Sequence, residues 1–556
     1  MPISALTCAT SVALIAPFGL EAVSNPVRVA SSRMSETFYG PTGRVWVALF
    51  VVALGFLLAA LLPTINLPWV EEDDYYGALY SQAAHNNLRA GLCVTGGVPV
   101  TLYFGPLPIP RDAYYVHHPV LMPLMVTAAV AIFGEREWSV RLVPILCSVA
   151  SALFLWLLVR DAMGRRAAAL ATAFFVTLPM ELHYGDMVDF EPPILTLMLA
   201  ALVCLRCWHV RGTNMWIVLA GFCCGGAMWT DWPGYLFVLS ISIWLLLRKE
   251  RSARFFGIAL LAIAAASGTL FLLQIRHVNP GSWRDLWIAV TMRLGNGVAA
   301  GSSQIDPAME LHFTFGKWVR RILQSLGQDY LSWTWGFVLL GTIFLVRNRK
   351  SSGWRWLGWA VLQMAAAGIP YMLLLRNWSY IHDWASFSLI GAISIQSGLG
   401  LEGLMEWMDR STVKFFQPVG AIAIVILFVF LSAAGFMQAE AQRSQLTMLD
   451  GQVSEPARLA PDMGRYLQRA FPADTTILCN FDPYYSALSY YAQRTILRNV
   501  GTADEWKDAL DDSERLGGIL WMGAPSTPEI LAVLPKDEVQ QVEIDGIRFA
   551  VWRLGR

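Results

Sequence analysis

Residues 71–78 read Glu71-Glu72-Asp73-Asp74-Tyr75-Tyr76-Gly77-Ala78 and follow directly after an apolar segment at residues 44–64. An apolar segment of roughly 20 residues is long enough to cross a bilayer as a helix. The four acidic residues therefore lie at the end of a predicted membrane span. One interpretation is a solvated helix end. The other is a functional site, because carboxylates packed together raise one another's pKa, which suits a general base.

Further apolar segments of similar length follow along the chain and predict a polytopic, mainly α-helical membrane protein. The predicted spans lie near residues 44–64, 138–159, 167–182, 192–209, 214–230, 234–248, 255–274, 329–347, 354–375, 384–402 and 415–437. Residues 119–134 are also apolar but short, and we expect a helix at the membrane interface there.

The composition divides the chain into two parts. Charged residues make up 15% of all 556 residues, against about 25% in a typical soluble protein, which excludes an ordinary cytosolic enzyme. Residues 441–556 hold 28 of the charges in 116 positions, so this part has the composition of a soluble domain. The formal net charge is zero and gives no indication of nucleic-acid binding.

Basic residues predict the orientation. They gather in five short connections, whereas the connections near 184–191 and 231–233 have no Lys or Arg. The positive-inside rule places the basic connections in the cytoplasm. We therefore expect a disordered cytoplasmic start (1–43), a membrane module (44–440) with outer loops 65–137 and 276–328, and a periplasmic C-terminal domain (441–556). The basic residues are Arg160, Arg165, Arg166, Arg206, Arg211, Arg248, Lys249, Arg251, Arg254, Arg347, Arg349, Lys350, Arg355, Arg410 and Lys414.

The C-terminal domain is predicted to be α/β. Short apolar runs at 476–481, 495–500 and 518–522 indicate strands, and helical patterns at 483–493 and 503–516 separate them. Residues 541–553 are typical of a closing hairpin. This domain shows no phosphate loop, catalytic triad or metal cluster, so we expect the chemistry on the outer face of the membrane module.

Three more groups of polar residues fall on that outer face. They are His117-His118-Pro119, the loop from His183 to Pro193 with Asp186, Asp189 and Glu191, and the stretch from Arg376 to Trp384 with His382. An adjacent His pair at a membrane surface more often has no functional role than it forms a metal- or phosphate-binding site. With the acidic cluster at residues 71–74, four groups of polar residues are thus predicted on one face. Their convergence indicates a functional site more strongly than any one group does.

In their order and spacing these motifs resemble the C-type (GT-C) glycosyltransferases, in the branch of the protein O-mannosyltransferases and the lipid A aminoarabinose transferases. The resemblance covers residues 44–440. It is carried by Asp74-Tyr75-Tyr76-Gly77-Ala78 with Asn87-Leu88-Arg89-Ala90-Gly91, by His117-His118-Pro119 with Phe133-Gly134, Glu137-Trp138 and Arg141-Leu142, by Tyr184-Gly185 to Glu191-Pro192, and by His382-Asp383.

The resemblance implies an inverting transfer of a sugar from a polyprenyl-phosphate donor to a periplasmic lipid, glycan or protein acceptor at the bacterial inner membrane. An acceptor hydroxyl needs a general base, for which Asp74 is the first candidate and Asp73 the second. Asp189 or Glu191 corresponds to the second acid of the family. The leaving phosphate needs neutralising groups, for which the candidates are Arg276, Arg284, Arg293, Lys317, Arg320, Arg321, His118 and His382.

Three questions stay open at this point. A divalent metal held by Asp189, Glu191 and His382 could balance the outer acids, or side chains such as His118, His382 and Arg141 could do so without a cofactor. We expect Asp74 and the Asp189/Glu191 pair to line one pocket. A periplasmic lipid-glycan ligase or polymerase, or a transporter, is the alternative function.

Overall fold

The structure is a computed structural model that describes residues 41–70, 74–294, 313–409, 416–446, 459–481, 485–497, 500, 502–512, 516–534 and 538–553. The candidate base Asp73, residues 1–40 of the predicted N-terminal segment and residues 295–312 of the predicted outer loop therefore lie outside the described residues. Residues 46–556 form one compact unit.

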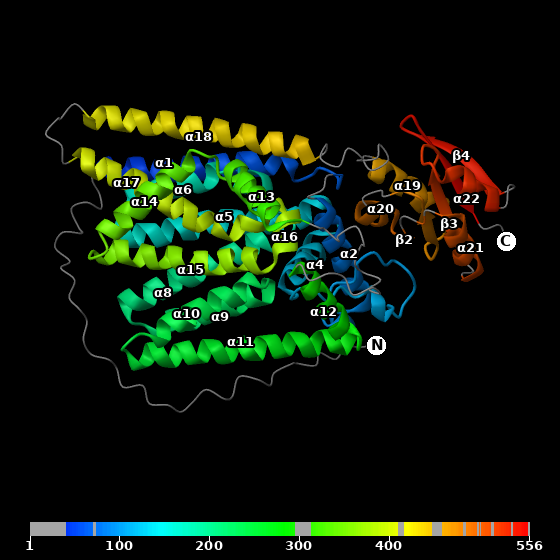
Figure 1. Cartoon of the computed structure of the whole chain (residues 1–556), viewed down its shortest axis with the longest axis horizontal. Coiled ribbons are helices and arrows are strands. Elements are labelled where there is room, and N and C mark those ends of the chain that lie inside the picture. The colour runs from blue at the N-terminus through cyan, green and yellow to red at the C-terminus, as the bar shows by residue number, and fades with distance from the viewer. Residues whose placement is uncertain are drawn as a thin grey trace, which may run out of the picture. The chain divides into compact units, whose positions relative to one another are not determined.

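Helices make up the membrane module, and the long ones run side by side (Figure 1). Neighbouring pairs include α5 with α8, α6 with α17, and α14 with α17. The helices are α1 (Pro41–Leu61), η1 (Leu62–Thr64), α2 (Asp74–Ala90), α3 (Leu92–Thr95), η2 (Arg111–Ala113), α4 (Leu121–Phe133), α5 (Glu137–Met163), α6 (Arg165–Thr177), α7 (Pro179–Tyr184), α8 (Glu191–Arg211), α9 (Asn214–Thr230), α10 (Pro233–Leu246), α11 (Arg251–Val278), α12 (Ser282–Arg293), α13 (Phe315–Asp329), α14 (Thr334–Arg347), α15 (Ser352–Leu374), α16 (Arg376–Ile381), η4 (Asp383–Leu389), α17 (Ile390–Asp409) and α18 (Phe416–Leu446).

All eleven predicted spans fall on helices, which confirms the mainly α-helical membrane fold. Within the described residues, seven helices are long and apolar enough to cross a membrane, and an eighth span is possible if α13 and α14, which meet at 92°, count as one. The segment 167–182 is divided, because Pro179 starts a new helix, α7, after α6 has ended at Thr177. The predicted interface segment 119–134 forms α4, which has only 13 residues.

Glycines let the helices approach closely around α17. A Cβ added at Gly398 would lie 2.5 Å from the backbone nitrogen of Ala171 on α6, and one at Gly341 on α14 would overlap the carbonyl of Gln396 on α17. Small residues at such crossings allow backbone-to-backbone packing, which is the main source of helix association in a bilayer. These glycines therefore allow α17 to pack closely against α6 and α14.

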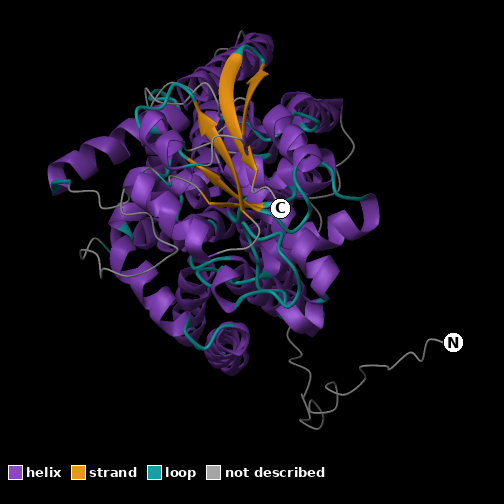
Figure 2. Ribbon diagram, turned by 90° about the vertical axis from the view of Figure 1, so that its right-hand side faces the viewer, coloured by secondary structure: helices purple, strands orange, loops and turns teal. Residues whose placement is uncertain are grey.

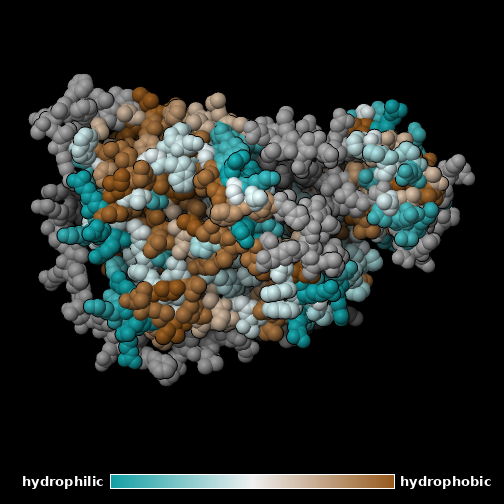
Figure 3. Space-filling view, viewed as in Figure 1, coloured by the Kyte–Doolittle hydropathy of each residue, from teal (hydrophilic) through white to brown (hydrophobic). Residues whose placement is uncertain are grey.

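The outer surface of the long helices is apolar. Hydrophobic side chains cover the helices, whereas hydrophilic ones gather toward their ends (Figure 3). Exposed large apolar side chains include Val51, Ile258, Leu270, Ile343 and Phe430. A soluble surface seldom exposes so continuous an apolar area, so this surface fits the hydrocarbon of a membrane.

The C-terminal domain contains a five-stranded sheet in the order β2-β1-β3-β5-β4, shown in orange in Figure 2. The strands β1 and β2 and the strands β1 and β3 pair in parallel, while β5 pairs antiparallel with β3 and β4. This confirms the predicted strands and the closing hairpin; the strands are β1 (Thr476–Cys479), β2 (Thr495–Leu497), β3 (Leu516–Trp521), β4 (Val539–Ile544) and β5 (Ile547–Arg553). The helices are α19 (Ala460–Ala470), α20 (Tyr485–Ala492), α21 (Ala503–Asp512) and α22 (Thr527–Val533).

The orientation stays a prediction, and reporter fusions test it. A periplasm-dependent reporter fused after residue 440 should be active, because an N-terminus inside and the alternation of basic connections place this point outside. The same reporter inserted near Lys350 should be inactive, while a cytoplasm-dependent reporter there should be active. The reverse pattern would contradict the predicted side of every site residue.

Candidate functional site

A cavity with an empty volume of about 310 Å³ collects residues from segments far apart in the sequence. Among the described residues its lining consists of Tyr76, Tyr115, His118, Asp189, Phe190, Glu191, Asp231, Arg293, Trp378 and His382.

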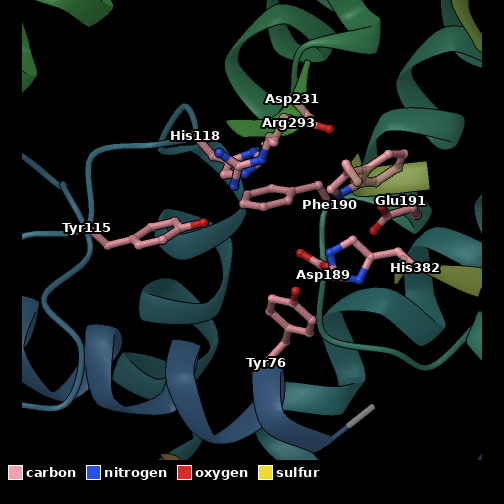
Figure 4. Close-up of a pocket in the computed structure, with 10 residues that line it drawn as sticks. Tyr76, Tyr115, His118, Asp189, Phe190, Glu191, Asp231, Arg293 and His382 are labelled. Atoms are coloured by element: carbon pink, nitrogen blue, oxygen red, sulfur yellow. Dashed lines mark hydrogen bonds and ion pairs between the residues drawn. The ribbon is translucent and has the colours of Figure 1, made fainter. Parts of the chain in front are cut away.

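The Phe190 ring divides this cavity into two sides (Figure 4). His118 and Arg293 lie on one side of it, and the ring of His118 stacks on that of Phe190 with centroids 4.5 Å apart. Asp189 and His382 lie on the other side. The arrangement separates a basic side from an acidic side within one small volume.

The acidic side comes from the short loop between α7 and α8. The backbone N–H of Asp189 donates to the carbonyl of Met187 at 2.8 Å, which closes a tight turn. Pro192 and Pro193 then stand in the first turn of α8, where proline lacks only an N–H that would have no partner inside the helix. The Oδ1 atom of Asp189 and the Oε2 atom of Glu191 are buried and have no hydrogen-bond partner among the described residues. These two oxygens are therefore available to a ligand.

Burial raises the pKa of Asp189 well above its ordinary value, and the nearby charge of Asp231 raises it further. A hydrogen bond from the backbone of Phe190 opposes the shift without reversing it. Ionisation of Asp189 therefore requires a higher pH or a compensating positive charge nearby.

On the basic side, His118 is fixed by a carboxylate. Its Nδ1 lies 2.8 Å from Oδ1 of Asp231, and both side chains are buried. The Trp232 indole donates to the carbonyl of His117 at 3.1 Å, and Tyr371 donates to Asp231 at 3.4 Å. Burial lowers the pKa of His118 although Asp231 opposes the shift, so the imidazole is neutral at pH 7. Since a carboxylate only accepts, the Nδ1–H of neutral His118 is the donor.

Arg293 is the last residue of α12, and it is the cation among the described lining residues. Its guanidinium hydrogen-bonds the side chain of Tyr115. The end of α12 is held in place by Asn377 of α16, whose amide donates to the carbonyl of Met292 at 2.6 Å. Two neighbouring segments thus fix the position of this positive charge.

His382 lies between α16 and η4, with its ring centroid 4.5 Å from that of Trp384 and 5.5 Å from that of Trp378. Burial, together with the charge of Arg293, lowers its pKa to about 3. His382 is therefore neutral at physiological pH and supplies a hydrogen-bonding or ligating nitrogen but no charge.

Aromatic rings surround the acidic side. Tyr76 contacts Trp384 edge to face, with centroids 5.9 Å apart, and Tyr184 lies 5.7 Å from the same indole. Tyr80 contacts Phe190 at 5.6 Å. Rings with a polar edge and an apolar face, combined with a few convergent polar groups, are typical of small-molecule sites. The cavity therefore has the lining expected for a polar ligand with apolar faces, such as a sugar.

Asp74, the first candidate base, does not line this cavity. Its carboxylate forms an ion pair with Arg141 at 2.5 Å and accepts a hydrogen bond from the backbone of Val70 at 3.1 Å. Arg141 also donates to the carbonyl of Leu67. The structure thus brings Asp74 to Arg141, one of the predicted counter-charges, while the lining residue of α2 is Tyr76.

Most of the predicted phosphate ligands do not line this cavity. Arg276, Arg284, Lys317 and Arg320 are exposed, and Arg321 pairs with Asp383. Of the predicted ligands, those that line the cavity are Arg293, His118 and His382. The two histidines are neutral there, so the expected positive charge comes from Arg293.

Asp231 was missed by the sequence analysis. The signal is present in the sequence, because this acid stands in a short connection, 231–233, that contains no Lys or Arg to pair with it. A partner from a distant segment is then required, and His118 is that partner.

A divalent metal has two ligands available in the cavity. The unpartnered oxygens of Asp189 and Glu191 suit a hard cation. Among the described residues, however, no three His, Cys, Asp or Glu side chains are arranged to hold one ion, so His382 does not complete a site with them. Asp189 and Glu191 alone therefore provide too few ligands for a divalent ion. Phosphate oxygens of a substrate would have to supply the others.

Comparison with known families and proteins agrees with this geometry. A family model described as dolichyl-phosphate-mannose-protein mannosyltransferase matches residues 117–273, which include His117, His118, Asp189, Glu191 and Asp231. YkcB of Bacillus subtilis (strain 168), named as a mannosyltransferase, is 24% identical over 289 residues, or 50% of this chain and 36% of that protein.

A second relative is undecaprenyl phosphate-alpha-4-amino-4-deoxy-L-arabinose arabinosyl transferase 2 of Proteus mirabilis (strain HI4320). It is 22% identical over 267 residues, or 46% of this chain and 45% of that protein. This chain thus spans less than half the length of either curated relative.

Among solved structures, ArnT from Cupriavidus metallidurans bound to undecaprenyl phosphate superimposes with a TM-score of 0.58 at 17% identity. The match covers 92% of this chain and 98% of that one. The family model over residues 117–273 and the two relatives confirm the predicted resemblance to the C-type (GT-C) glycosyltransferases, and the chain shares the fold of ArnT.

Proposed function

We propose that this protein transfers a sugar from a polyprenyl-phosphate carrier to an acceptor at the outer face of the bacterial inner membrane. The observation that carries the proposal is the two-sided cavity, in which Arg293 lies on one side of Phe190 and Asp189 on the other. A transferase of this kind needs a cation for the leaving phosphate and a base for the acceptor, a few ångströms apart.

The basic side of the cavity would bind the donor phosphate. Arg293 supplies a planar fork of donors that matches phosphate oxygens. His118 stands beside it, and Asp231 would stabilise the imidazolium if the phosphate draws a proton onto this ring. The ArnT structure bound to undecaprenyl phosphate supports this choice of donor class.

The acidic side would activate the acceptor. The acceptor oxygen attacks the anomeric carbon while its proton passes to a carboxylate. The bond from the anomeric carbon to the phosphate oxygen breaks, and its electron pair leaves with the phosphate. A single displacement of this kind inverts the anomeric configuration. We propose Asp189 as the base, because it lines the cavity with a free oxygen; Asp74, which pairs with Arg141, is the alternative.

The direct test uses purified protein in nanodiscs with an undecaprenyl-phosphate sugar donor. The lipid-linked sugars of the native membrane serve as the donor mixture, and extracted envelope lipids, glycans and proteins serve as acceptors. We expect release of undecaprenyl phosphate together with a glycosylated product, and loss of one defined sugar from the envelope when the gene is deleted. A glycan polymer formed from lipid-linked units would support a ligase instead, and substrate crossing a sealed bilayer without product would support a transporter.

Chelation tests the metal. We expect EDTA to change the transfer rate by less than about twofold, because among the described residues no third His, Cys, Asp or Glu is arranged with Asp189 and Glu191 to hold one ion. Loss of activity on chelation, restored by added magnesium or manganese, would show that an ion completed by the substrate phosphate is required.

A further inference from the structure

The C-terminal domain packs directly on the helix that carries Tyr76 into the cavity. The side chain of Gln82 on α2 donates to the carbonyl of Ser486 on α20 at 2.6 Å, and the hydroxyl of Ser486 donates back to the carbonyl of Tyr75 at 3.1 Å. Gln82 and Ser486 are fully buried. One buried apolar cluster contains Ala83 of α2 and Leu488 of α20, so the two elements share a core.

A single hydroxyl group on α20 joins three segments of the chain. The hydroxyl oxygen of Tyr491 accepts a hydrogen bond from the backbone N–H of Trp69 at 2.8 Å. The same group donates to Oε1 of Glu137, at the start of α5, at 2.7 Å. Tyr491 therefore ties the segment before α2 and the beginning of α5 to the C-terminal domain.

From Trp69 the contacts continue to the first turn of α2. The indole of Trp69 is fully buried and packs on the surface of α2 at Gly77, where any side chain would overlap it. The guanidinium of Arg141 lies 4.0 Å from the centre of the indole ring, and it forms the ion pair with Asp74, the first residue of α2. Tyr76 follows two residues later and lines the cavity.

The hydroxyl of Tyr76 points toward Asp189 on the acidic side (Figure 4). Burial, and next the charge of Asp189, raise the pKa of Tyr76 well above its ordinary value, so the hydroxyl keeps its proton and acts as a donor. A change in the direction of the first turn of α2 would therefore alter the surroundings of the proposed base.

We propose that the C-terminal domain positions the active site, and that Tyr491 is the positioning residue which acts through Trp69 and the first turn of α2 on Tyr76. This inference rests on the proposed function. It gives the domain a role in the reaction although the domain contributes no described residue to the cavity lining. A shift of about 1 Å in a reacting group lowers rates by up to about 100-fold.

The test compares Tyr491→Phe with Tyr466→Phe in the full-length protein. Both changes remove one hydroxyl from a tyrosine of the C-terminal domain. Tyr466, on α19, is partly buried in the same apolar cluster but does not contact the segment before α2 by any hydrogen bond found in the described residues. We expect Tyr491→Phe to lower kcat about tenfold with the KM for the donor within about twofold, because binding on the Arg293 side is untouched. Tyr466→Phe should leave both values unchanged.

Hydrogen exchange gives a second readout that does not depend on transfer. We expect faster exchange of the peptides covering residues 66–82 in Tyr491→Phe, and wild-type exchange there in Tyr466→Phe. Faster exchange with unchanged kcat would show that the contact is structural only, and unchanged exchange would show that Tyr491 does not hold this segment. Either result overturns the inference. If the wild-type protein neither binds undecaprenyl phosphate nor transfers a sugar, the proposed function fails instead, and the exchange comparison still decides whether Tyr491 orders α2.

Discussion

Replacement of Asp189 by asparagine is expected to lower kcat/KM for sugar transfer by at least about 100-fold. Asparagine keeps the size of the side chain but cannot take a proton from the acceptor hydroxyl, and a positioned base contributes about 100-fold or more. The measurement is steady-state transfer by the purified variant in nanodiscs, with thermal unfolding and binding of undecaprenyl phosphate as checks that the protein is intact. Activity above about a tenth of the wild-type value would remove Asp189 from this role.

The pH dependence of the wild-type protein gives an independent check. Because burial and Asp231 raise the pKa of Asp189, the fraction of free enzyme with an ionised base increases as the pH rises through that raised pKa. The value of kcat/KM should therefore increase as the pH is raised from acidic values. This pH-dependent increase should be absent in Asp189→Asn. His382, with a pKa of about 3, stays neutral throughout and does not contribute to this increase.

Two further variants separate the neighbouring acids. Glu191→Gln should also reduce transfer, since a neutral amide changes the field around Asp189. Asp74→Asn is the decisive comparison, because the sequence favours Asp74 as the base whereas its ion pair with Arg141 favours a role in holding α2. A loss in Asp74→Asn as large as that in Asp189→Asn, with unchanged hydrogen exchange at 66–82, would favour the sequence interpretation. Wild-type rates in the Asp189→Asn, Glu191→Gln double variant would show that this loop has no catalytic role and serves only as the proline-capped start of α8.

Most of the fold was predictable because it depends on segment length and apolar character. The apolar segment 354–375, for example, forms the helix α15. In a bilayer the backbone N–H and C=O groups have no water as a hydrogen-bond partner, so an apolar segment of this length forms a helix whatever its neighbours are. The breaks were not predictable to the same degree. Pro179 accounts for the end of α6, but no such residue in the sequence marks the 92° turn between α13 and α14.

The site was predictable as a face of the molecule but not as a set of side chains. The alternation of basic connections predicts that residues 117–118, 186–191 and 376–384 share one membrane face, and the structure brings His118, Asp189 and His382 into one cavity. Sequence alone cannot tell which side chains point inward. Arg284 and Arg293 both belong to α12, but nine residues at about 100° each place them on opposite faces, and only packing against α16 decides which face meets the cavity.

Long-range ion pairs explain the remaining differences. Arg141 lies 67 residues after Asp74, and Asp231 lies 113 residues after His118. No local sequence pattern therefore predicts either pair. Both pairs are buried or partly buried, where an unpaired charge is costly and a partner is required. The need for partners could be stated from the sequence, whereas their identity required the fold.

Replacement of Arg293 by glutamine should lower kcat by about 100-fold or more and weaken binding of undecaprenyl phosphate. Arg293 is the cation among the described lining residues, and the neutral His118 and His382 cannot replace its charge as negative charge develops on the leaving phosphate. Removal of one preorganised donor from such a site typically costs about 100- to 1,000-fold, or about 3 to 4 kcal/mol. Arg284→Gln is the matched control, because it removes the same group from an exposed position of the same helix, and it should keep wild-type values. Arg293→Lys should recover part of the loss, since it restores the charge without the two-pronged hydrogen bonding. Equal effects of Arg293→Gln and Arg284→Gln would mean that α12 acts through its general charge, and the cavity would then not be the phosphate site.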